Sequence, residues 1–398
     1  MTDKPLSQGE FVALMAMLFA TIALSIDAML PALPQIAATL SPSAPNAAQL
    51  VVTSFVFGMG VGTLFAGPLS DTFGRKRVIM AGSGLYALAA VACYLAPTLE
   101  TLLIARVVQG LGAAAPRTVS IAMIRDLFSG REMARLMSFV MMVFTAVPAI
   151  APLLGQGIIA LADWHAIFLA YIAFSGLTML WLGLRQPETL DIARRRPLRL
   201  VPLIAATREL LSHRIVLVST VLQALTLGAL FATLSSIQPI FEMVHDRAQS
   251  FPLWFALIAV ASMSGSFLNS RIVMALGMRR VVRGTYAAQL TLSLATLLLM
   301  PFLEGNLSFA LQILWSIGLF AMMGLTAGNL NALAMEPVGH IAGLAASVIS
   351  ALATVGSVLL AIPVGLAFDG TPTPLLVGVA LLIGTALVLS RLALGEPR

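Results

Sequence analysis

Charge is what this sequence has least of: Asp, Glu, Lys and Arg together make up only 10% of its 398 residues, whereas 59% are hydrophobic. The mean hydropathy of +0.97 is too high for a soluble domain of this length. This balance excludes water as the main solvent of the folded chain, because a soluble protein needs more polar residues to cover its surface. We therefore expect the chain to lie within a membrane.

Cysteine and metal-binding patterns are also missing. Cys93 is the only cysteine, which excludes an intramolecular disulfide and leaves nothing from which a zinc or redox motif can be built. No nucleophile–base set is apparent, so we expect neither enzymatic activity nor a cofactor. No metal site is expected, because no pair of histidines has metal-ligand spacing and all four lie near expected helix ends: His165, His213, His245 and His340.

Long apolar runs recur along the whole chain. A helix needs about 20 mostly apolar residues to cross a hydrocarbon core of about 30 Å. Backbone polar groups in lipid must be paired internally, so such runs must be helical. The sequence predicts twelve spans, at residues 10–33, 47–66, 78–96, 101–124, 135–161, 164–184, 214–237, 251–273, 281–303, 308–333, 341–368 and 374–394.

The basic residues are distributed unevenly between the loops. With both termini placed inside, twenty of the 23 Lys and Arg residues fall in inward-facing segments. The outward loops hold one basic residue, Arg247, against six acidic ones. This asymmetry is the positive-inside rule and predicts cytoplasmic termini. It also accounts for the net charge of +6 without a nucleic-acid partner.

The chain divides into two halves of similar pattern. We expect six-helix bundles at 1–184 and 214–398, joined by a polar cytoplasmic linker at 185–213 that contains a short amphipathic helix near 200–211 on the membrane surface. The loop GPLSDTFGRKR after the second span aligns with SRIVMALGMRR after the eighth, and this alignment places Gly74 over Gly277. The offset of 203 residues is close to half the chain, which indicates an eroded duplication.

Asp27 is the only carboxylate well inside a span, in the stretch LSIDAMLPALP. Its carbonyl would normally accept a hydrogen bond from residue 31, but Pro31 has no N–H, so the helix is weakened beside the acid. A buried acid is costly, which favours a functional role. The alternative is that Pro31 and Pro34 end the helix early and leave Asp27 at the membrane interface.

Two arginines lie inside the fourth span. Arg106 is a functional candidate because an intramembrane Arg needs a cavity or a partner, although a structural salt bridge is an alternative. Gln109 lies one turn along on the same face. The depths of Asp27 and Arg106 differ by only about 5 Å, so we expect the two to exchange interactions. Arg117 points the same way as Arg106, and it either meets a substrate or proton path or extends from a helix end to the interface.

Three motifs carry a resemblance that covers the whole chain: GPLSDTFGRKR at 67–77, IARVVQGLG at 104–112 and VPAIAPLLGQG at 147–157. With them, the sequence resembles the major facilitator superfamily, and within it the twelve-helix drug:proton antiporters of the bicyclomycin-resistance/chloramphenicol-resistance type. The resemblance implies an all-α membrane protein with twelve transmembrane helices in two pseudo-symmetric six-helix bundles.

The first motif is similar to motif A, which in that family latches the two halves on the cytoplasmic side. Its glycines permit a tight turn, and Asp71 can accept from a neighbouring helix N-terminus and pair with the basic run. A solvated turn is the alternative. In the second-half copy Met274 replaces Asp71, so we expect an asymmetric latch. The implied gating residues are Gly67, Asp71, Gly74, Arg75, Lys76 and Arg77.

The second motif resembles motif B of the family and contains Arg106. The third resembles the antiporter motif C on the fifth helix, although the family's Gly-Pro pair is replaced. Prolines and glycines allow a bend and close helix contact. An ordinary membrane kink and a direction-setting role both fit these residues, which are Pro148, Pro152, Gly155 and Gly157.

The resemblance implies proton-coupled efflux of small amphipathic or apolar compounds, antibiotics among them, across a bacterial inner membrane by a monomer. Asp27 and Arg106 would couple protons. The expected substrate cavity comprises Asp27, Arg106, Gln109, Arg117, Gln223 and Asn329. Its partners are a drug-like compound, protons and membrane lipids. A facilitator or proton symporter of a metabolite would use the same fold. A membrane enzyme or receptor lacks support because the sequence contains no clustered chemistry.

Overall fold

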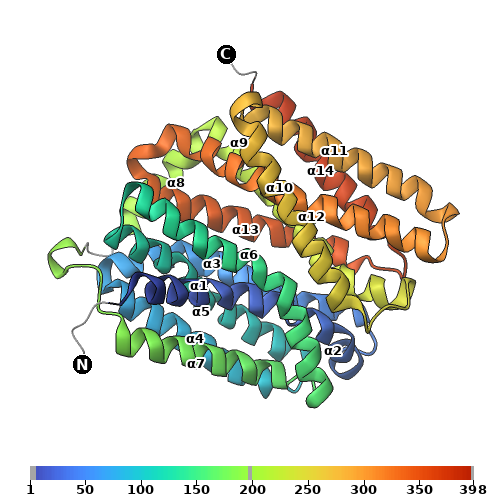
Figure 1. The fold of residues 1–398 in the computed structure, drawn as a ribbon, viewed down its shortest axis with the longest axis horizontal. Helices are drawn as coiled ribbons and strands as arrows, with labels where there is room; N and C mark the ends of the chain where they lie inside the picture. The colour runs from blue at the N-terminus through green and yellow to red at the C-terminus, as the bar shows by residue number, and fades with distance from the viewer. Residues whose placement is uncertain (1–5, 196–199, 396–398) are drawn as a thin grey trace. The chain divides into compact units, whose positions relative to one another are not determined.

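The computed structural model describes residues 6–195 and 200–395, and almost all of these residues are helical. The order of the elements along the chain is visible in Figure 1. The bounds of the helices are α1 (Gln8–Asp27), η1 (Leu30–Ala32), α2 (Leu33–Leu40), η2 (Pro45–Gln49), α3 (Leu50–Phe73), α4 (Arg75–Tyr94), α5 (Leu99–Leu127), α6 (Gly130–Leu161), α7 (Ala166–Arg185), η3 (Ile192–Arg194), α8 (Leu200–Ser212), α9 (Arg214–Pro239), η4 (Ile240–Val244), α10 (Phe251–Leu276), α11 (Met278–Leu299), η5 (Met300–Phe302), α12 (Gly305–Met335), η6 (Glu336–Ile341), α13 (Ala342–Leu366) and α14 (Thr373–Ala393).

The described residues contain eleven helical stretches that are long and apolar enough to cross a membrane. One of them, Gly305–Leu366, has 62 residues. At 1.5 Å per residue it would extend about 90 Å, three times the thickness of the hydrocarbon core. It consists of α12 and α13 joined by the 3-10 segment η6, in which Val338 leaves helical geometry. Counted as two spans, these helices give the predicted number of twelve.

Two local predictions are confirmed at helix boundaries. The α-helix α1 ends at Asp27, and the chain continues as the 3-10 turn η1 with Pro31 in its first turn. The helix expected near 200–211 is present as α8. Part of the linker, residues 196–199, lies outside the described residues.

The described chain forms two compact units. Unit 1 comprises residues 1–43 and 54–204, and unit 2 comprises residues 44–53 and 205–398. In unit 1, α4 packs against both α5 and α7, and α1 packs against α6. These pairs are visible side by side in Figure 1.

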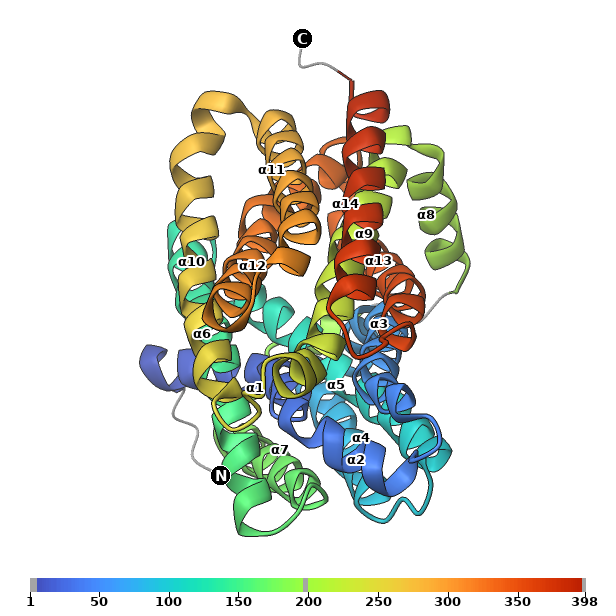
Figure 2. The ribbon, with the colours of Figure 1, turned by 90° about the vertical axis from the view of Figure 1, so that its right-hand side faces the viewer.

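Unit 2 is built from a corresponding set of helix pairs. The helix α9 packs against α13, α10 against α12, and α11 against α14, which run side by side in Figure 2. Gly74 and Gly277, the positions aligned in the sequence, both have positive φ, 101° and 79°, and nearly the same ψ. Each is the single residue between two long helices. The loops expected after the second and eighth spans therefore consist of one glycine each, because the other motif residues belong to the helices on either side.

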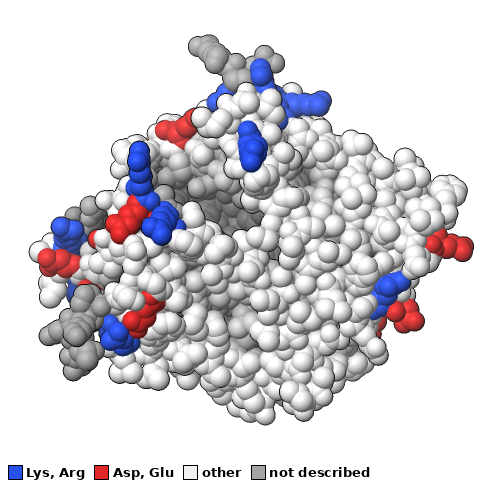
Figure 3. All heavy atoms as spheres, viewed as in Figure 1, with Lys and Arg blue, Asp and Glu red and all other residues white. Residues whose placement is uncertain are grey.

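Apolar side chains cover much of the outside of both units. Leu88, Ile104, Leu298 and Leu381 are each about two-thirds exposed or more. On the face seen in Figure 3, the charged side chains gather in a few places and the broad remainder is uncharged. Such a surface suits lipid rather than water, since soluble monomers rarely expose contiguous apolar surface of this extent.

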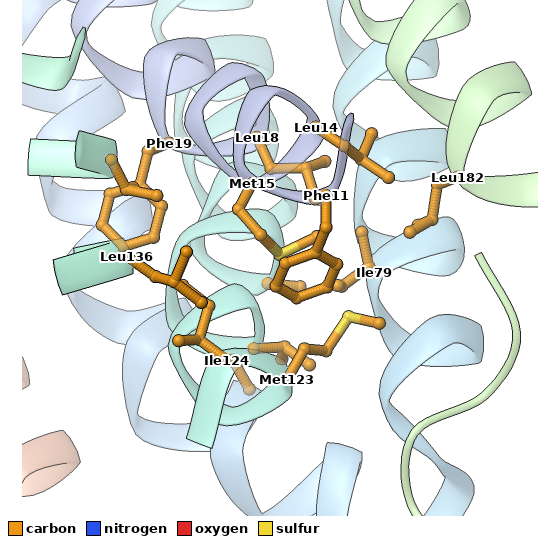
Figure 4. Close-up of a cluster of buried hydrophobic side chains, with 14 residues drawn as sticks. Phe11, Leu14, Met15, Leu18, Phe19, Ile79, Met123, Ile124, Leu136 and Leu182 are labelled. Atoms are coloured by element: carbon orange, nitrogen blue, oxygen red, sulfur yellow. The ribbon is translucent and has the colours of Figure 1, made fainter. Parts of the chain in front are cut away.

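A cluster of buried apolar side chains in unit 1 joins six helices, α1, α3, α4, α5, α6 and α7. Phe11, Met15 and Phe19 extend from α1 toward Met123 of α5 and Leu136 of α6. Figure 4 shows that Ile79 of α4 and Leu182 of α7 close the cluster from the other side. The cluster holds α1 in place, and α1 carries Asp27 at its end.

Close helix contact in unit 1 depends on small residues. Gly58 of α3 lies against the backbone of Val107, and Gly110 of α5 lies against the backbone of Phe55. A Cβ at either glycine would collide with a main-chain oxygen. Because backbone cannot move aside as a flexible side chain can, α3 and α5 must separate if either position is enlarged.

We expect Gly110→Ala to destabilise the protein by about 2 kcal/mol through overpacking. Gly176 of α7 is the matched control, since a Cβ there meets nothing within 4 Å. Gly176→Ala should leave stability unchanged or raise it by about 0.5 kcal/mol, because alanine favours the helix. Thermal unfolding of both variants in detergent measures the difference. Equal melting temperatures would contradict the close-contact interpretation.

Candidate functional site

Asp27 is the last residue of α1, and it is only 5% exposed. Pro31 does end the α-helix, as the sequence predicts, but the acid is buried within unit 1. Helix α6 approaches closely at this point, because Gly155 lies against the backbone of Ala28. The helix end that both readings of Asp27 expected is present, and the acid beside it is buried in the protein.

Arg106 lies on α5 and is completely buried. Its guanidinium donates from Nη2 to the carbonyl of Ser25 over 3.0 Å, and from Nη1 to Oε1 of Gln109 over 2.7 Å. It also lies 4.5 Å from the centroid of the Phe55 ring. The expected pairing of Arg106 with Gln109 along one helix face is present.

The carbonyl of Ser25 can bind Arg106 because the helix ends nearby. Within a continuing α-helix this carbonyl would accept the amide of Met29, but that amide donates to Ile26 instead, over 3.3 Å. The carbonyl instead accepts from Arg106 and from the Tyr171 hydroxyl, which is 3.2 Å away. The end of α1 thus creates the acceptor that positions the buried cation.

Two tyrosines complete this polar centre, and the sequence analysis did not identify them. The Tyr86 hydroxyl lies 2.6 Å from Oγ of Ser25, and Tyr171 bonds the carbonyls of Leu24 and Ser25. Both tyrosines are buried. A signal was available, because the chain has only four tyrosines and all of them lie inside predicted apolar spans, where a hydroxyl needs a partner.

Arg106 lies close to the end of α1 that carries Asp27. The guanidinium of Arg106 donates to the carbonyl of Ser25, a main-chain oxygen two residues before the acid. Two of its partners are the neutral oxygens of Ser25 and Gln109, and the exchange of interactions between Arg106 and Asp27 stays a prediction.

The other expected cavity residues are placed separately. Arg117 is half-buried on α5, after Pro116. Gln223 and Asn329 belong to unit 2. Gln223 is half-buried, whereas the Asn329 amide is buried and donates to Oδ1 of Asn269 on α10, over 2.8 Å. The bond to Asn269 gives Asn329 a helix-joining role that the sequence did not predict.

Arg75 is the centre of the motif A cluster and is 4% exposed. Its guanidinium bonds the Asp71 carboxylate over 2.5 Å, the Ser70 hydroxyl over 2.7 Å and Asp126 of α5 over 2.9 Å. The predicted pairing of Asp71 with the basic run is confirmed. The Ser70 hydroxyl also donates to the carbonyl of Gly67. Ser70 therefore links Gly67, at the start of the motif, to Arg75 near its end.

Glu188, which follows α7, has the role that the sequence analysis gave to Asp71. Its carboxylate accepts the amides of Arg75 and Lys76 at the N-terminus of α4, over 2.8 and 3.2 Å. Lys76 in turn donates to the carbonyl of Gly183, near the end of α7. A carboxylate at a helix N-terminus is favourable because it satisfies free amides and complements the helix dipole. Arg77 is exposed.

The motif C residues divide in two. Gly155 makes the close contact with α1, whereas Gly157 is open, with nothing within 4 Å of a Cβ. Pro148 and Pro152 lie inside α6, which is continuous from Gly130 to Leu161. The expected close helix contact therefore rests on Gly155, and it occurs beside Asp27.

We expect Arg75→Lys to destabilise the protein by about 2 kcal/mol. A lysine keeps the charge, but a single ammonium cannot reach Ser70, Asp71 and Asp126 in the planar geometry of the guanidinium. Arg77→Lys is the control, because the Arg77 side chain is exposed. Thermal unfolding in detergent free of anionic lipid should separate the two variants. A similar loss in both would mean that the cluster contributes no specific stability.

Three known bacterial proteins are similar to this chain in sequence. The chain is 33% identical over 339 residues to an uncharacterized MFS-type transporter of Bacillus subtilis, covering 83% of this chain and 82% of that one. It is 31% identical over 371 residues to a bicyclomycin resistance protein homolog of Haemophilus influenzae, covering 92% and 91% of the two chains. It is 38% identical over 161 residues, 40% of each chain, to the multidrug resistance protein MdtL of Shigella flexneri.

Two solved structures have a similar fold, although their sequences are only distantly similar to this chain. A D-xylose-proton symporter superposes with a TM-score of 0.73 over 95% of both chains, at 16% identity. The xylose transporter XylE of E. coli superposes with a TM-score of 0.72 over 96% of both chains, at 13% identity. At these identities the likeness concerns the fold alone. Residues 14–361 match the family model of the Major Facilitator Superfamily, and the chain therefore belongs to this family of membrane transporters.

Proposed function

We propose that this transporter exports small amphipathic or apolar compounds, antibiotics among them, in exchange for protons. The main support for this proposal is the position of Asp27. This carboxylate is buried at the end of α1, two residues after the carbonyl that binds Arg106. A carboxylate in this position can accept and release a proton, and a nearby cation that binds a neutral oxygen can respond to its charge. The names of relatives in Haemophilus influenzae and Shigella flexneri favour a drug as the substrate.

Coupling would proceed through competition for Asp27. When Asp27 loses its proton, its negative charge attracts Arg106 away from the Ser25 carbonyl or attracts a cationic substrate. Hydrogen bonds to an ionised partner are roughly twice as strong as those between neutral groups, so the carboxylate competes well with the carbonyl. Protonation from the periplasm removes the charge and returns Arg106 to Ser25. Asp27 and Arg106 are thus the proposed proton-coupling pair.

The remaining parts of the proposal concern topology and transport. The chain would lie as a monomer in a bacterial inner membrane with both termini in the cytoplasm, as the distribution of Lys and Arg favours. Bundles 1–184 and 214–398 would rock about a central site, with 185–213 as the cytoplasmic linker. The motif A cluster around Arg75 would latch the cytoplasmic side. Gln109, Arg117, Gln223 and Asn329 would contribute polar groups to the substrate cavity.

Asp27→Asn tests the proposed chemistry, because it keeps the shape of the side chain and removes its titration. In everted membrane vesicles with an acidic interior, adding bicyclomycin or another exported antibiotic should release protons from vesicles that contain the unaltered protein. Asp27→Asn should abolish this release, and Asp27→Glu should retain part of it. A fluorescent probe of the vesicle pH gradient records the signal, with protein amounts matched by immunoblotting.

The same assay distinguishes a symporter. An importer that carries its substrate together with protons would not discharge the gradient when substrate is added outside everted vesicles. Unchanged proton release in Asp27→Asn would overturn the assignment of Asp27. In an efflux-deficient host, we expect the unaltered chain to raise the inhibitory concentration of at least one antibiotic in a panel, and Asp27→Asn to remove that protection.

Gly155 provides a further test of the geometry around Asp27. Gly155→Ala introduces a Cβ that collides with the backbone at Ala28, so we expect α6 to shift away from the end of α1 and transport to fall at least tenfold. Gly157→Ala, two residues along the same helix, meets nothing and should transport normally. Initial efflux rates in matched cells measure the difference. Equal rates for both variants would contradict a role for the contact at Gly155.

A further inference from the structure

A cavity of about 400 Å³ opens beside the beginning of α4 in unit 1. It is lined by Lys76, Arg77, Met80, Glu188 and Arg195, which come from α4 and from the chain after α7. The cavity lies where α4 begins, at Arg75, and where α7 ends, at Arg185. Both helices are candidate membrane spans, so the cavity is at the level where hydrocarbon gives way to headgroups.

The lining has an excess of positive charge. Three of its side chains are cationic and one is acidic, so the net charge of the lining is 3 − 1 = +2. The single carboxylate, on Glu188, already accepts the amides of Arg75 and Lys76, and also those of Thr189 and Leu190. These bonds hold Glu188 in the wall of the cavity, where it is occupied with backbone donors.

The two arginines are the groups that can receive an anion. Arg77 is exposed. The Nε of Arg195 is buried and has no hydrogen-bond partner among the described residues. One of its terminal nitrogens lies 3.1 Å from the place where a Cβ would stand on Gly74, so the side chain is packed over the turn. A buried N–H without an acceptor is costly, and an anionic oxygen would remove that cost.

Apolar side chains also stand on α4 and α7, the two helices whose ends lie beside the cavity. Met80 forms one wall, and its terminal methyl group reaches toward Gly183 of α7. Leu180 and Leu184 of α7 are 59% and 63% exposed, and both lie within the last two turns before Arg185. A ligand with an anionic head and apolar chains therefore fits this position better than a small soluble anion, which would use the cations but not the leucines.

We propose that this cavity binds the phosphate of an anionic phospholipid headgroup, with the acyl chains lying on the exposed leucines of α7. The phosphate oxygens would accept hydrogen bonds from Arg77 and Arg195, whose planar guanidinium groups suit a phosphate. Lys76 would add charge while its ammonium remains bonded to the carbonyl of Gly183. This site is separate from Asp27 and Arg106 and does not depend on the proposed transport activity.

The experiment is native mass spectrometry of the full-length protein in detergent, titrated with phosphatidylglycerol, with phosphatidylcholine and with inorganic phosphate. We expect the unaltered protein to retain phosphatidylglycerol in preference to phosphatidylcholine. Arg77→Gln and Arg195→Gln should each lower the retained phosphatidylglycerol about fivefold, and the double variant should lower it about 25-fold. These values follow from the typical contribution of one basic residue to lipid binding at a membrane surface.

Arg194→Gln is the matched control. Arg194 adjoins Arg195 and has the same charge, but it is exposed and does not line the cavity. It should retain phosphatidylglycerol as the unaltered protein does. Melting temperatures without lipid establish that each variant is folded, and phosphatidylglycerol should raise the melting temperature of the unaltered protein more than that of Arg195→Gln.

Three results would overturn the proposal. An equal loss of phosphatidylglycerol in Arg194→Gln would mean that the effect is one of general charge. Equal retention of phosphatidylcholine and phosphatidylglycerol would remove the requirement for an anionic headgroup. Binding of inorganic phosphate that depends on Arg195, without a preference for phosphatidylglycerol, would reassign the cavity to a free anion.

Discussion

Pro31 has no amide hydrogen, and the polar centre of unit 1 is organised around the helix end that precedes it. The α-helix stops at Asp27, the amide of Met29 turns to Ile26, and the carbonyl of Ser25 is left to accept from side chains. A main-chain oxygen without a partner would be costly in an apolar interior. Arg106 and Tyr171 satisfy it, so the break in α1 and the buried cation stabilise each other.

The two units share a backbone plan but differ in chemistry. Gly74 and Gly277 occupy equivalent turns with positive φ in the two units. The hydroxyl of Tyr286 bonds that of Thr226 in unit 2, and the hydroxyl of Tyr86 bonds that of Ser25 in unit 1. At the motif A position, however, Met274 is 90% exposed, where Asp71 is bound to Arg75. The duplication has therefore preserved turns and helix contacts while the charged cluster belongs to unit 1. The sequence predicts this difference between Asp71 and Met274, whereas the latch itself stays a prediction.

The fold could be predicted from the sequence because lipid imposes a simple rule on length and polarity. Apolar runs of about 20 residues must be helices, and this rule located twelve spans. Short-range contacts were also accessible: Arg106 with Gln109 and Asp71 with Arg75 are three and four residues apart on one helix face. In these cases the chain itself brings the partners together.

Contacts between distant segments were not accessible in the same way. Glu188 lies more than 110 residues from the amides that it caps, and Asp126 lies 51 residues from Arg75. Nothing in the local pattern distinguishes Gly155, which lies against the backbone of Ala28, from Gly157, where an added Cβ would meet nothing within 4 Å. Which residues form such pairs depends on how the helices pack. Before that packing is known, each charged residue has several possible partners of opposite charge.

Three neutral groups contact Arg106, and under the proposed coupling their weakness would let one proton at Asp27 change the position of the guanidinium. Ser25 and Gln109 supply uncharged oxygens, and Phe55 supplies a ring face. Each holds a guanidinium more weakly than a carboxylate does. An ionised Asp27 two residues from Ser25 therefore offers a stronger ligand at a short distance, whereas a protonated Asp27 offers no such advantage. A shift between two arrangements requires only that their free energies differ by a few kcal/mol between the two protonation states. Because α1 ends at Asp27, the segment whose Ser25 carbonyl binds Arg106 would, under the proposed coupling, also carry the charge that attracts it.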